Sequence, residues 1–398
     1  MAYQTLKGFR DFLPNDALKR KWLREKIEAV FQKWGYDPIE TPTLEPLELF
    51  KGQIGEDEKL FYTFKDQGKR EIALRYDQTV PACRVVGQYS QKLPIPFKRY
   101  QIQSAFRAEK PQKGRYREFL QCDADIFGVE SPLADAEVIA LSLDIYKELG
   151  FKSYKVLIND RELLAKIPYK ALVCIDKLKK VGEEKVLTEM QKREIAESDA
   201  KKYLEFVKNL KPNETINVIL KYLKDYGFNE KTFAFDPTII RSFSYSTGPI
   251  WEVEILGFEA GSVLGGERYD KLVETVSGKK VPGTGFAIGF DRTLEAMEQF
   301  GLIPEQKTSS KILVTVFSKE LFEKSLEISK YLRDKKINTE LYPSFNAKLD
   351  KQFKYASRKN IPFVLVLGPD EAEKGVVTLK DLRSKKQKTL KLEEINIK

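Results

Sequence analysis

The sequence of 398 residues contains no histidine. Histidine is the side chain that most often exchanges protons near neutral pH, and it is a common metal ligand. Its absence therefore excludes hydrolases built on a serine-histidine-aspartate triad, most zinc enzymes and transfer through phosphohistidine. Reactions that depend mainly on stabilising charge on phosphate groups survive this exclusion.

Cysteines and long apolar runs are also scarce. The three cysteines, Cys83, Cys122 and Cys174, have no CxxC spacing and cannot all pair, so we expect a reducing compartment, no disulfide and no zinc site. No run of about eighteen apolar residues occurs, and the first residues resemble neither a signal peptide nor a transit peptide. The expectation is a soluble cytoplasmic protein with no membrane partner.

Positive charge is concentrated at one end of the chain. The net charge is +10, and residues 311–398 alone hold 20 Lys and Arg against 12 Asp and Glu, a net charge of +8. Such a segment suits a polyanionic partner, although many basic proteins are only well solvated. We favour an RNA-binding appendix over a uniformly solvated surface.

Hydrophobic periodicity predicts helices and strands in separate segments. An amphipathic helix is predicted over Asp16–Lys33, with Gly35 as its stop, and an extended stretch over Tyr36–Phe50. Further predicted elements are paired strands at 61–64 and 70–75, a helix at 133–149 and a strand at 155–158. The last part predicts a parallel or mixed α/β sheet, with strands at 312–317, 339–341 and 363–367 and helices at 320–334 and 349–358. A chain of this length is expected to form two or three domains.

The segment Phe106–Asp125, FRAEKPQKGRYREFLQCDAD, has the most informative pattern in the chain. It predicts a hairpin, with Arg107 and Glu109 on one face, a basic loop, and a strand whose shared face carries residues 117, 119, 121, 123 and 125. An arginine can bind a phosphate through two hydrogen bonds, and a nearby carboxylate can accept one from the amino group of a base. The segment therefore predicts a nucleotide site in a polar pocket.

This segment resembles motif 2 of the class II aminoacyl-tRNA synthetases, in the form found in histidyl-tRNA synthetases. Four other stretches resemble that family and stand in its order: LRYDQTVP (74–81), RSFSYSTG (241–248), GGERYD (265–270) and the motif 3-like GTGFAIGFDR (283–292). The resemblance covers nearly the whole chain. It implies an α+β catalytic core, an antiparallel sheet with helices, interrupted by a helical insertion and followed by a C-terminal α/β anticodon-binding domain.

The resemblance also implies domain boundaries and partners. A homodimer would form through the first helix and the strand after it, with Pro42 at the motif 1 position. The expected domains are a catalytic core at 1–166 and 234–300, a helical insertion at 167–233, a linker at 301–310 and an anticodon-binding domain at 311–398. The implied activity is ATP-dependent activation of L-histidine and its transfer to the 3' end of tRNA(His), a ligase reaction that forms AMP and pyrophosphate. Mg2+ would arrive with ATP, and no metal would be held by the protein alone.

Activation brings a carboxylate onto the α-phosphate of ATP, so two anions must meet among cations that stay in place. By the resemblance, Arg107 and Arg241 act at the α-phosphate and Arg292 at the γ-phosphate. Glu109 would contact the adenine, and Arg115 would be a further ATP-binding residue.

The same resemblance implies how the amino acid and the tRNA are bound. Asp77 and Thr79, on one face of a strand, would hold the ammonium group, and Gln121 would act beside the substrate carboxylate as a catalytic residue. Asp125 would accept a hydrogen bond from the imidazole. The other expected contacts are Tyr245 and Tyr269 at the histidine side chain and Lys110 and Gln112 at the acceptor end of the tRNA.

Three positions depart from the family pattern. Ser246 stands where the family usually has a tyrosine of the imidazole pocket, so the site is either wider or covered by Tyr245 or Tyr269. Glu267 replaces a glycine and either shifts the backbone or adds a charge, and Lys110 replaces an arginine. Two alternatives follow: a non-catalytic, synthetase-like regulatory subunit of histidine biosynthesis, and a class II synthetase with another amino-acid specificity.

Overall fold

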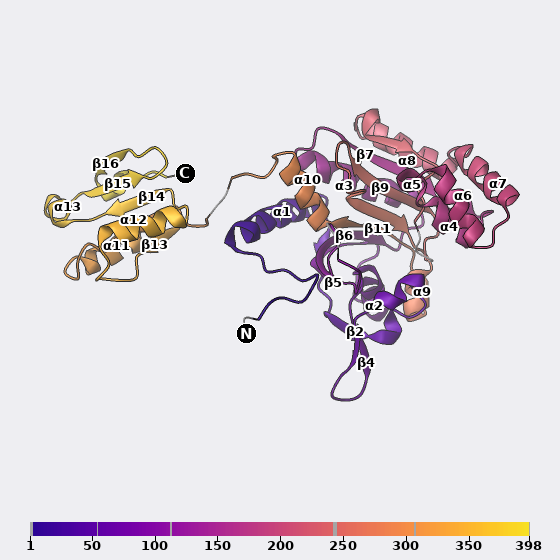
Figure 1. Cartoon of the computed structure of the whole chain (residues 1–398), viewed down its shortest axis with the longest axis horizontal. Coiled ribbons are helices and arrows are strands. Elements are labelled where there is room, and N and C mark those ends of the chain that lie inside the picture. The colour runs from indigo at the N-terminus through magenta and orange to yellow at the C-terminus, as the bar shows by residue number, and fades with distance from the viewer. Residues whose placement is uncertain (1–2, 54, 112–113, 242–244, 306–307, 398) are drawn as a thin grey trace. The chain divides into compact units, whose positions relative to one another are not determined.

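The computed structural model describes residues 3–53, 55–111, 114–241, 245–305 and 308–397 (Figure 1). The chain divides into two compact units, one with residues 1–11 and 23–303 and one with residues 12–22 and 304–398. In the part of the chain that the structure describes, no helix is long and apolar enough to cross a membrane.

An eight-stranded sheet forms the centre of the first unit. Neighbouring strands run antiparallel, except that β1 runs parallel to β5 and β8 runs parallel to β7 at the two edges. In their order across the sheet the strands are β1 (Asp37–Pro38), β5 (Phe97–Phe106), β6 (Glu118–Phe127), β11 (Gly283–Gly289), β10 (Leu264–Arg268), β9 (Pro249–Ile255), β7 (Tyr154–Asp160) and β8 (Phe233–Phe235).

Strands β5 and β6 form the predicted hairpin. Their register runs from Phe97 opposite Phe127 to Phe106 opposite Glu118, so the first strand is longer than the motif itself. The backbone N–H of Arg107 still donates to the carbonyl of Arg117, at 2.9 Å, and the chain then enters the basic loop. The hairpin is therefore confirmed, with Arg107 at the mouth of its loop.

Helices cover one face of the large sheet (Figure 1). Helix α1 (Pro14–Lys33) places the Phe31 ring 5.2 Å from that of Tyr100 on β5 and 6.2 Å from that of Phe286 on β11. Helix α3 (Pro132–Glu148) is buried along most of its length, and α10 (Phe290–Gln299) follows β11 directly. Because side chains alternate along a strand, the neighbours of Phe286 on β11 face away from α1.

A smaller set of elements lies over the opposite face. The three-stranded antiparallel sheet β2 (Leu44–Pro46), β4 (Glu71–Leu74) and β3 (Thr63–Lys65) shares a core with α2 (Thr79–Tyr89) and α9 (Leu272–Ser277). The strand pair predicted at 61–64 and 70–75 is confirmed with shifted ends. The continuous extended stretch predicted over 36–50 is wrong: it breaks into β1, β2 and the 3-10 turn η1 (Leu47–Leu49). Prolines at 38, 42 and 46 explain the break, because proline has no N–H to donate to a ladder.

Helices follow between β7 and β8 and make a core of their own. Leu172, Val186 and Leu204 are among its buried members. The bounds are η3 (Arg161–Leu164), α4 (Tyr169–Ile175), α5 (Leu178–Val181), α6 (Glu183–Lys192), α7 (Glu197–Lys208), α8 (Glu214–Asp225) and η4 (Glu230–Thr232).

The second unit contains a mixed five-stranded sheet of order β13-β12-β14-β15-β16. The parallel part, β13 (Thr339–Leu341), β12 (Ile312–Val314) and β14 (Phe363–Val366), carries the predicted α11 (Phe322–Asp334) and α12 (Leu349–Arg358). Helix α13 (Pro369–Lys374) and the antiparallel strands β15 (Val377–Asp381) and β16 (Gln387–Leu390) were not predicted. Strand β16 is polar and exposed, so it lacks a clear hydrophobic alternation, whereas β15 does alternate Val377 and Leu379 with polar residues and was overlooked.

Candidate active site

A cavity of about 640 Å³ lies on the face of the large sheet opposite α1. Its floor is β11, where Gly285, Ala287 and Gly289 take the alternate positions that face away from the helix. Small residues leave the middle of the sheet open, and larger side chains on β6 and β10 form the walls. The volume lies in the range of small-molecule sites.

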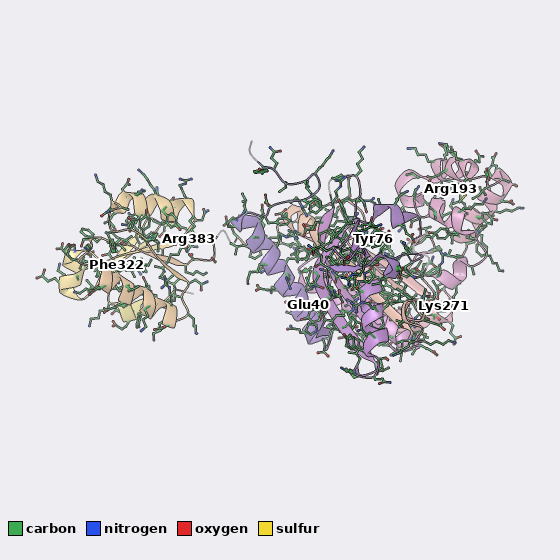
Figure 2. The ribbon with its side chains drawn as sticks, turned by 90° about the horizontal axis from the view of Figure 1, so that it is seen from below. Glu40, Tyr76, Arg193, Lys271, Phe322 and Arg383 are labelled. Atoms are coloured by element: carbon green, nitrogen blue, oxygen red, sulfur yellow. The ribbon has the colours of Figure 1, made fainter. Side chains whose placement is uncertain are left out.

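Arg107 enters the cavity from the start of the basic loop. Its guanidinium carbon lies 4.2 Å from the centre of the Tyr76 ring and 5.1 Å from that of Phe119. Its Nε donates to the carbonyl of Tyr76, at 3.3 Å. Tyr76 is 1% exposed and lies in the interior of the first unit (Figure 2). Two rings and a carbonyl therefore hold this cation in place.

Arg292 enters from the first turn of α10. Its Nη1 donates to the carbonyl of Ser262, at 3.0 Å, and its Nε donates to that of Gly114, at 3.4 Å. Burial, with the nearby positive charge of Arg115, lowers the pKa of Arg292 from its usual value. Two arginines brought together at a partly buried position favour an anionic ligand between them.

Arg241 lies over Gly265 of β10, where a Cβ would come within 1.7 Å of its Nη1. Its Nε lies 3.3 Å from a carboxylate oxygen of Glu267, and its Nη1 lies 3.8 Å from one of Glu252. Burial acts to lower the pKa of Arg241, but these two carboxylates outweigh it and raise the pKa. The guanidinium stays charged inside the cavity.

Asp77 and Gln121 each bring to the cavity a buried oxygen that has no hydrogen-bond partner among the described residues. Oδ1 of Asp77 accepts from the backbone N–H of Val80, at 3.2 Å, whereas Oδ2 has no partner in the part of the chain that the structure describes. Burial raises the pKa of Asp77 from 3.8 to about 6. Gln78 holds this loop against the hairpin by donating from Nε2 to the carbonyls of Gln103, at 2.7 Å, and Gln121, at 3.2 Å. A ligand with several N–H donors would satisfy both free oxygens.

The strand predicted for Asp77 and Thr79 is wrong, although both line the cavity. Strand β4 ends at Leu74, and Thr79 is the first residue of α2. Asp77 precedes this helix and accepts from its first turn, as the short polar side chains at helix starts commonly do. The start of α2, and not the two-residue period of a strand, brings both side chains to the cavity.

Asp125 is buried behind Tyr269 and is not among the residues that line the cavity. Its Oδ1 accepts from the Tyr269 hydroxyl, and its Oδ2 lies 2.6 Å from Nη2 of Arg99. Burial raises the pKa of Asp125, and the charge of Arg99 opposes that rise. Tyr269 does line the cavity, and Tyr245 packs against its edge with ring centres 6.2 Å apart. The aromatic wall is thus in place, and the imidazole contact expected of Asp125 stays a prediction.

The basic loop contributes the remaining predicted residues. Glu109, Lys110 and Arg115 all line the cavity, and Nη1 of Arg115 donates to Oε2 of Glu109, at 3.4 Å. Gln112 lies outside the described residues.

Sequence analysis missed a contact between the amino-terminal segment and the cavity. Nη2 of Arg10 donates to Oδ1 of Asp291, at 2.8 Å, and its guanidinium lies 3.2 Å from the centre of the Tyr116 ring. Asp291 and Tyr116 both line the cavity, and the backbone of Arg117 donates to the carbonyl of Gly8. No local pattern links positions so distant in sequence, so only the fold reveals this contact.

The cavity also contains Glu267, which was noted only as a departure from the family pattern. It is 5% exposed, and the hydroxyl of Ser246 donates to its Oε2. Within the described residues no group of three or more Cys, Asp or Glu is placed to hold a metal ion. The arrangement can therefore bind two anions among Arg107, Arg241 and Arg292, with a cationic ligand group at Asp77.

Comparisons with known proteins agree over almost the whole chain. The family model described as histidyl-tRNA synthetase matches residues 8–200 and 183–293, and the model described as anticodon binding domain matches residues 311–396. The chain is 35% identical to a histidine–tRNA ligase of Cytophaga hutchinsonii over 443 residues, which covers 98% of this chain and 97% of that protein. It is 36% identical to a histidine–tRNA ligase of Helicobacter pylori over 417 residues, or 96% of this chain and 94% of that protein. The crystal structure of histidyl-tRNA synthetase from Nostoc sp. PCC 7120 superposes with a TM-score of 0.84 at 29% identity, covering 99% of each chain.

Proposed function

The chain belongs to the histidyl-tRNA synthetase family, and we propose that its cavity activates L-histidine with ATP and passes the histidyl group to tRNA(His). The reaction is that of a histidine–tRNA ligase. A carboxylate oxygen of histidine attacks the α-phosphorus, pyrophosphate leaves, and the terminal ribose hydroxyl of the tRNA then attacks the carbonyl carbon and releases AMP.

The observation that carries this proposal is that one cavity contains both cationic side chains for anions and buried acceptors for a cationic donor. Arg107, Arg241 and Arg292 provide positive charge, while Asp77 Oδ2 and Gln121 Oε1 are buried acceptors with no partner among the residues that the structure describes. An α-amino acid presents an ammonium donor and a carboxylate two bonds apart. It can therefore satisfy both acceptors and bring its carboxylate towards the arginines, where phosphates also bind.

Each arginine is assigned by its surroundings. We place Arg107 and Arg241 at the α-phosphate, where they stabilise the charge that develops as the new bond forms. We place Arg292, next to Arg115, at the γ-phosphate. Carbonyls, rings or carboxylates hold Arg107, Arg241 and Arg292 before any ligand binds, so these side chains need little rearrangement on binding.

The remaining assignments follow the walls of the cavity. Thr79 directs the ammonium group beside Asp77, and Glu109 accepts from the adenine amino group. Tyr245 and Tyr269 pack against the imidazole, and Asp125 acts through the Tyr269 hydroxyl that it holds.

The family uses ATP, generally with Mg2+. We propose that Mg2+ comes with the phosphates of ATP, since no protein cage for a metal occurs in the described part of the chain. The ion would supply further charge neutralisation on the phosphates.

We assign the tRNA to the loop of Lys110 and Gln112 at its acceptor end and to residues 311–398 at its anticodon. The net charge of +8 in that last segment supports an anionic partner. We also propose a homodimer; Leu44 and Phe64 of the small sheet, 44% and 45% exposed, are large apolar side chains that a partner would cover. The three cysteines are buried and form no disulfide, which suits a cytoplasmic location.

Histidine-dependent exchange of pyrophosphate into ATP, measured without tRNA, tests the proposal. We expect exchange with histidine and with none of the other amino acids. Activity with a different amino acid would favour altered specificity. Histidine binding without any exchange would favour the regulatory alternative.

Substitution of one arginine tests the assigned phosphate contact. Arg241→Ala should reduce exchange by about 100-fold or more, because one preorganised charge is lost at the reacting phosphate. Melting temperature and sedimentation should match those of the parent protein. Exchange at the parent rate would contradict the role given to Arg241.

A further inference from the structure

Glu267 is a buried carboxylate inside a cavity that is otherwise suited to anions. It is 5% exposed and lines the cavity, and Arg241 and Ser246 contact its two oxygens. A carboxylate at this depth would repel the phosphates of ATP unless it faced a donor. Each carboxylate oxygen can accept more than one hydrogen bond, so Glu267 can also accept from a donor on a bound substrate.

The sheet register fixes where Glu267 stands. It lies opposite Gly285 of β11, which in turn lies opposite Asp125 of β6. Glu267 and Asp125 thus flank one glycine in a single row across the cavity floor. Of these two carboxylates, Glu267 lines the cavity, whereas Asp125 contacts Tyr269 and Arg99 and is not among the lining residues.

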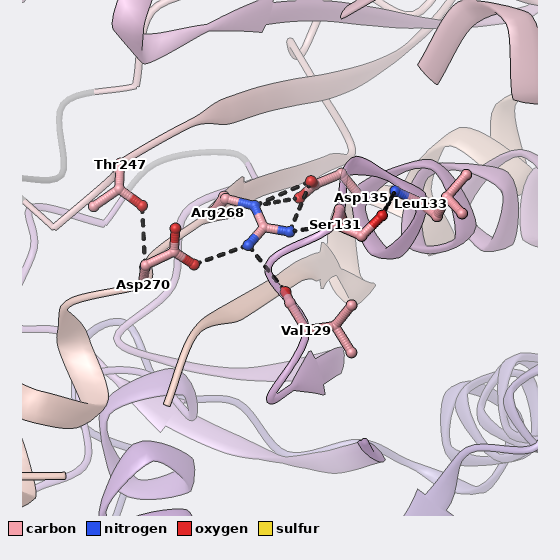
Figure 3. Close-up of polar contacts among 7 residues, drawn as sticks. All are labelled: Val129, Ser131, Leu133, Asp135, Thr247, Arg268 and Asp270. Atoms are coloured by element: carbon pink, nitrogen blue, oxygen red, sulfur yellow. Dashed lines mark hydrogen bonds and ion pairs between the residues drawn. The ribbon is translucent and has the colours of Figure 1, made fainter. Parts of the chain in front are cut away.

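The neighbouring residue on β10 prevents Glu267 from turning away. Figure 3 shows the Arg268 guanidinium between Asp135 and Asp270, at 2.8 and 2.9 Å, with a further bond to the carbonyl of Val129 at 3.1 Å. Arg268 points to the α3 side of the strand. Because successive side chains of a strand alternate, this clamp keeps Glu267 on the cavity side.

The N–H donors of the substrates can be matched to the acceptors of the cavity one by one. If the proposed function holds, the ammonium group is taken by Asp77, Thr79 and Gln121, and the adenine amino group by Glu109. The N–H of the histidine ring is the remaining donor among these groups. Glu267 is the remaining carboxylate beside the aromatic wall of Tyr245 and Tyr269.

We propose that Glu267 accepts a hydrogen bond from the imidazole N–H of the bound histidine and so selects this amino acid. The inference rests on the proposed function. Ser246 keeps the Glu267 carboxylate oriented by donating to Oε2, and Arg241 contacts Oε1. Phenylalanine, which has no ring N–H, would leave this further acceptor position of the buried carboxylate unfilled and is rejected for that reason.

The test measures binding of amino acids to the full-length protein by calorimetry, together with the exchange assay. Glu267→Gln keeps the size and one acceptor oxygen, Glu267→Ala removes both, and Glu254→Ala removes an exposed carboxylate from the neighbouring strand β9 as a control. Histidine is compared with its two ring N-methylated forms, which in the neutral ring have no N–H. Thermal melting confirms that each variant folds.

The expected result is a selective loss. Glu267→Ala should weaken histidine binding by about 10- to 100-fold, the range for a hydrogen bond to a charged group, and Glu267→Gln by less. The preference for histidine over its methylated forms should fall by about tenfold or more in Glu267→Ala. The KM for ATP should change little, and Glu254→Ala should bind histidine as the parent protein does.

Three results would overturn the inference while leaving the proposed function intact. Glu267→Ala could weaken histidine and its methylated forms equally, which would indicate an ammonium contact. It could change the KM for ATP or kcat without affecting histidine binding, which would indicate support of Arg241 alone. It could also bind histidine as tightly as the parent. An inactive parent protein that binds no histidine would instead refute the proposed function.

Discussion

Asp77 keeps a carboxylate in a place that favours its neutral form. Burial raises its pKa to about 6, because it removes the carboxylate from solvent, and Oδ2 has no hydrogen-bond partner among the described residues. In the free protein this residue therefore opposes folding at neutral pH. The bound ammonium group of a substrate would remove that penalty, since an opposite charge favours the ionised form.

Asp77→Asn should accordingly make the protein more stable and less active. In the unfolded chain the pKa returns to about 3.8, so the folded state binds the extra proton between these values and the parent loses stability as pH rises from about 4 to 6. The gain in unfolding free energy for Asp77→Asn should be on the order of 3 kcal/mol above pH 6 and vanish below pH 4.

Urea unfolding of both proteins at pH 4 and pH 7.5, without ligand, measures this difference. The exchange assay on the same preparations should show a large rise in the KM for histidine. Equal stability of the two proteins at pH 7.5 would mean that Asp77 is not strained in the free protein.

Individual residues were predictable from sequence where chemistry and a local pattern coincided. Arg107 and Glu109 stand beside a recognisable loop, and the structure brings both to the cavity. The engagement of Asp125 by Arg99 was not predictable, because it depends on the pairing of β5 with β6 and on a tyrosine from a distant segment. Glu267 was visible only as an exception to a pattern, and its burial needed the fold.

At the scale of elements, β10 and β11 both carry glycines at the cavity, but for different reasons. A Cβ at Gly265 would meet the flexible end of Arg241, at 1.7 Å. A Cβ at Gly285 would meet Oδ1 of Asp125, at 2.0 Å, and the backbone carbonyl of Ala124, at 2.7 Å. Gly265 of β10 leaves room for the Arg241 side chain, and Gly285 of β11 leaves room for Asp125 and for the backbone of the neighbouring strand β6.

Alanine at Gly265 should therefore mainly reduce activity, and alanine at Gly285 should mainly reduce stability. Gly265→Ala should displace Arg241 and reduce exchange by about 100-fold, while the unfolding free energy changes by less than about 1 kcal/mol. Gly285→Ala should cost about 2 kcal/mol of stability through overpacking.

Chemical denaturation and the exchange assay on both variants separate the two effects. Arg241→Ala serves as the reference for Gly265→Ala, because both remove the same charge from the cavity. Normal exchange in Gly265→Ala would show that Arg241 acts from another position.

Elements were predictable from sequence wherever an apolar period was long. Helices α1 and α3 follow from such patterns, whereas the β5–β6 hairpin was predicted from its basic loop and from polar residues at every second position. The error at Asp77 and Thr79 arose because two polar residues at i and i+2 suit a strand face as well as a helix start. Strand β16 is too polar for periodicity to reveal it, whereas the short alternation of Val377 and Leu379 in β15 was overlooked.

At the scale of the whole molecule, activation and tRNA recognition are expected to depend on different units. The cavity is built from the first unit alone, whereas the excess positive charge is in the second. The domain boundaries drawn from sequence remain a prediction. A truncated chain tests the boundary between the catalytic core and the last domain.

A chain that ends at Ile303 should keep histidine-dependent pyrophosphate exchange within about threefold and lose at least about tenfold in kcat/KM for aminoacylation of tRNA. The full-length chain should also show a steep decline of tRNA binding with added salt, because each phosphate contact releases counterions. Filter binding at several salt concentrations measures this slope, and the exchange rate of the truncated chain serves as its folding control. Unimpaired charging by the truncated chain would refute a role for the second unit.

The floor of the cavity consists of backbone, since Gly285, Ala287 and Gly289 present almost no side chain. Backbone hydrogen bonds join β11 to both neighbouring strands, β6 and β10. The position of the cavity floor is therefore set by these hydrogen bonds and not by side-chain rotamers. Amino-acid substitutions on β6 and β10 can then alter which substrate fits the cavity while its floor stays unchanged. Preference for a substrate can therefore drift during evolution by single steps in the walls, and the pairing of Ser246 with Glu267 is the kind of joint change that such a frame allows.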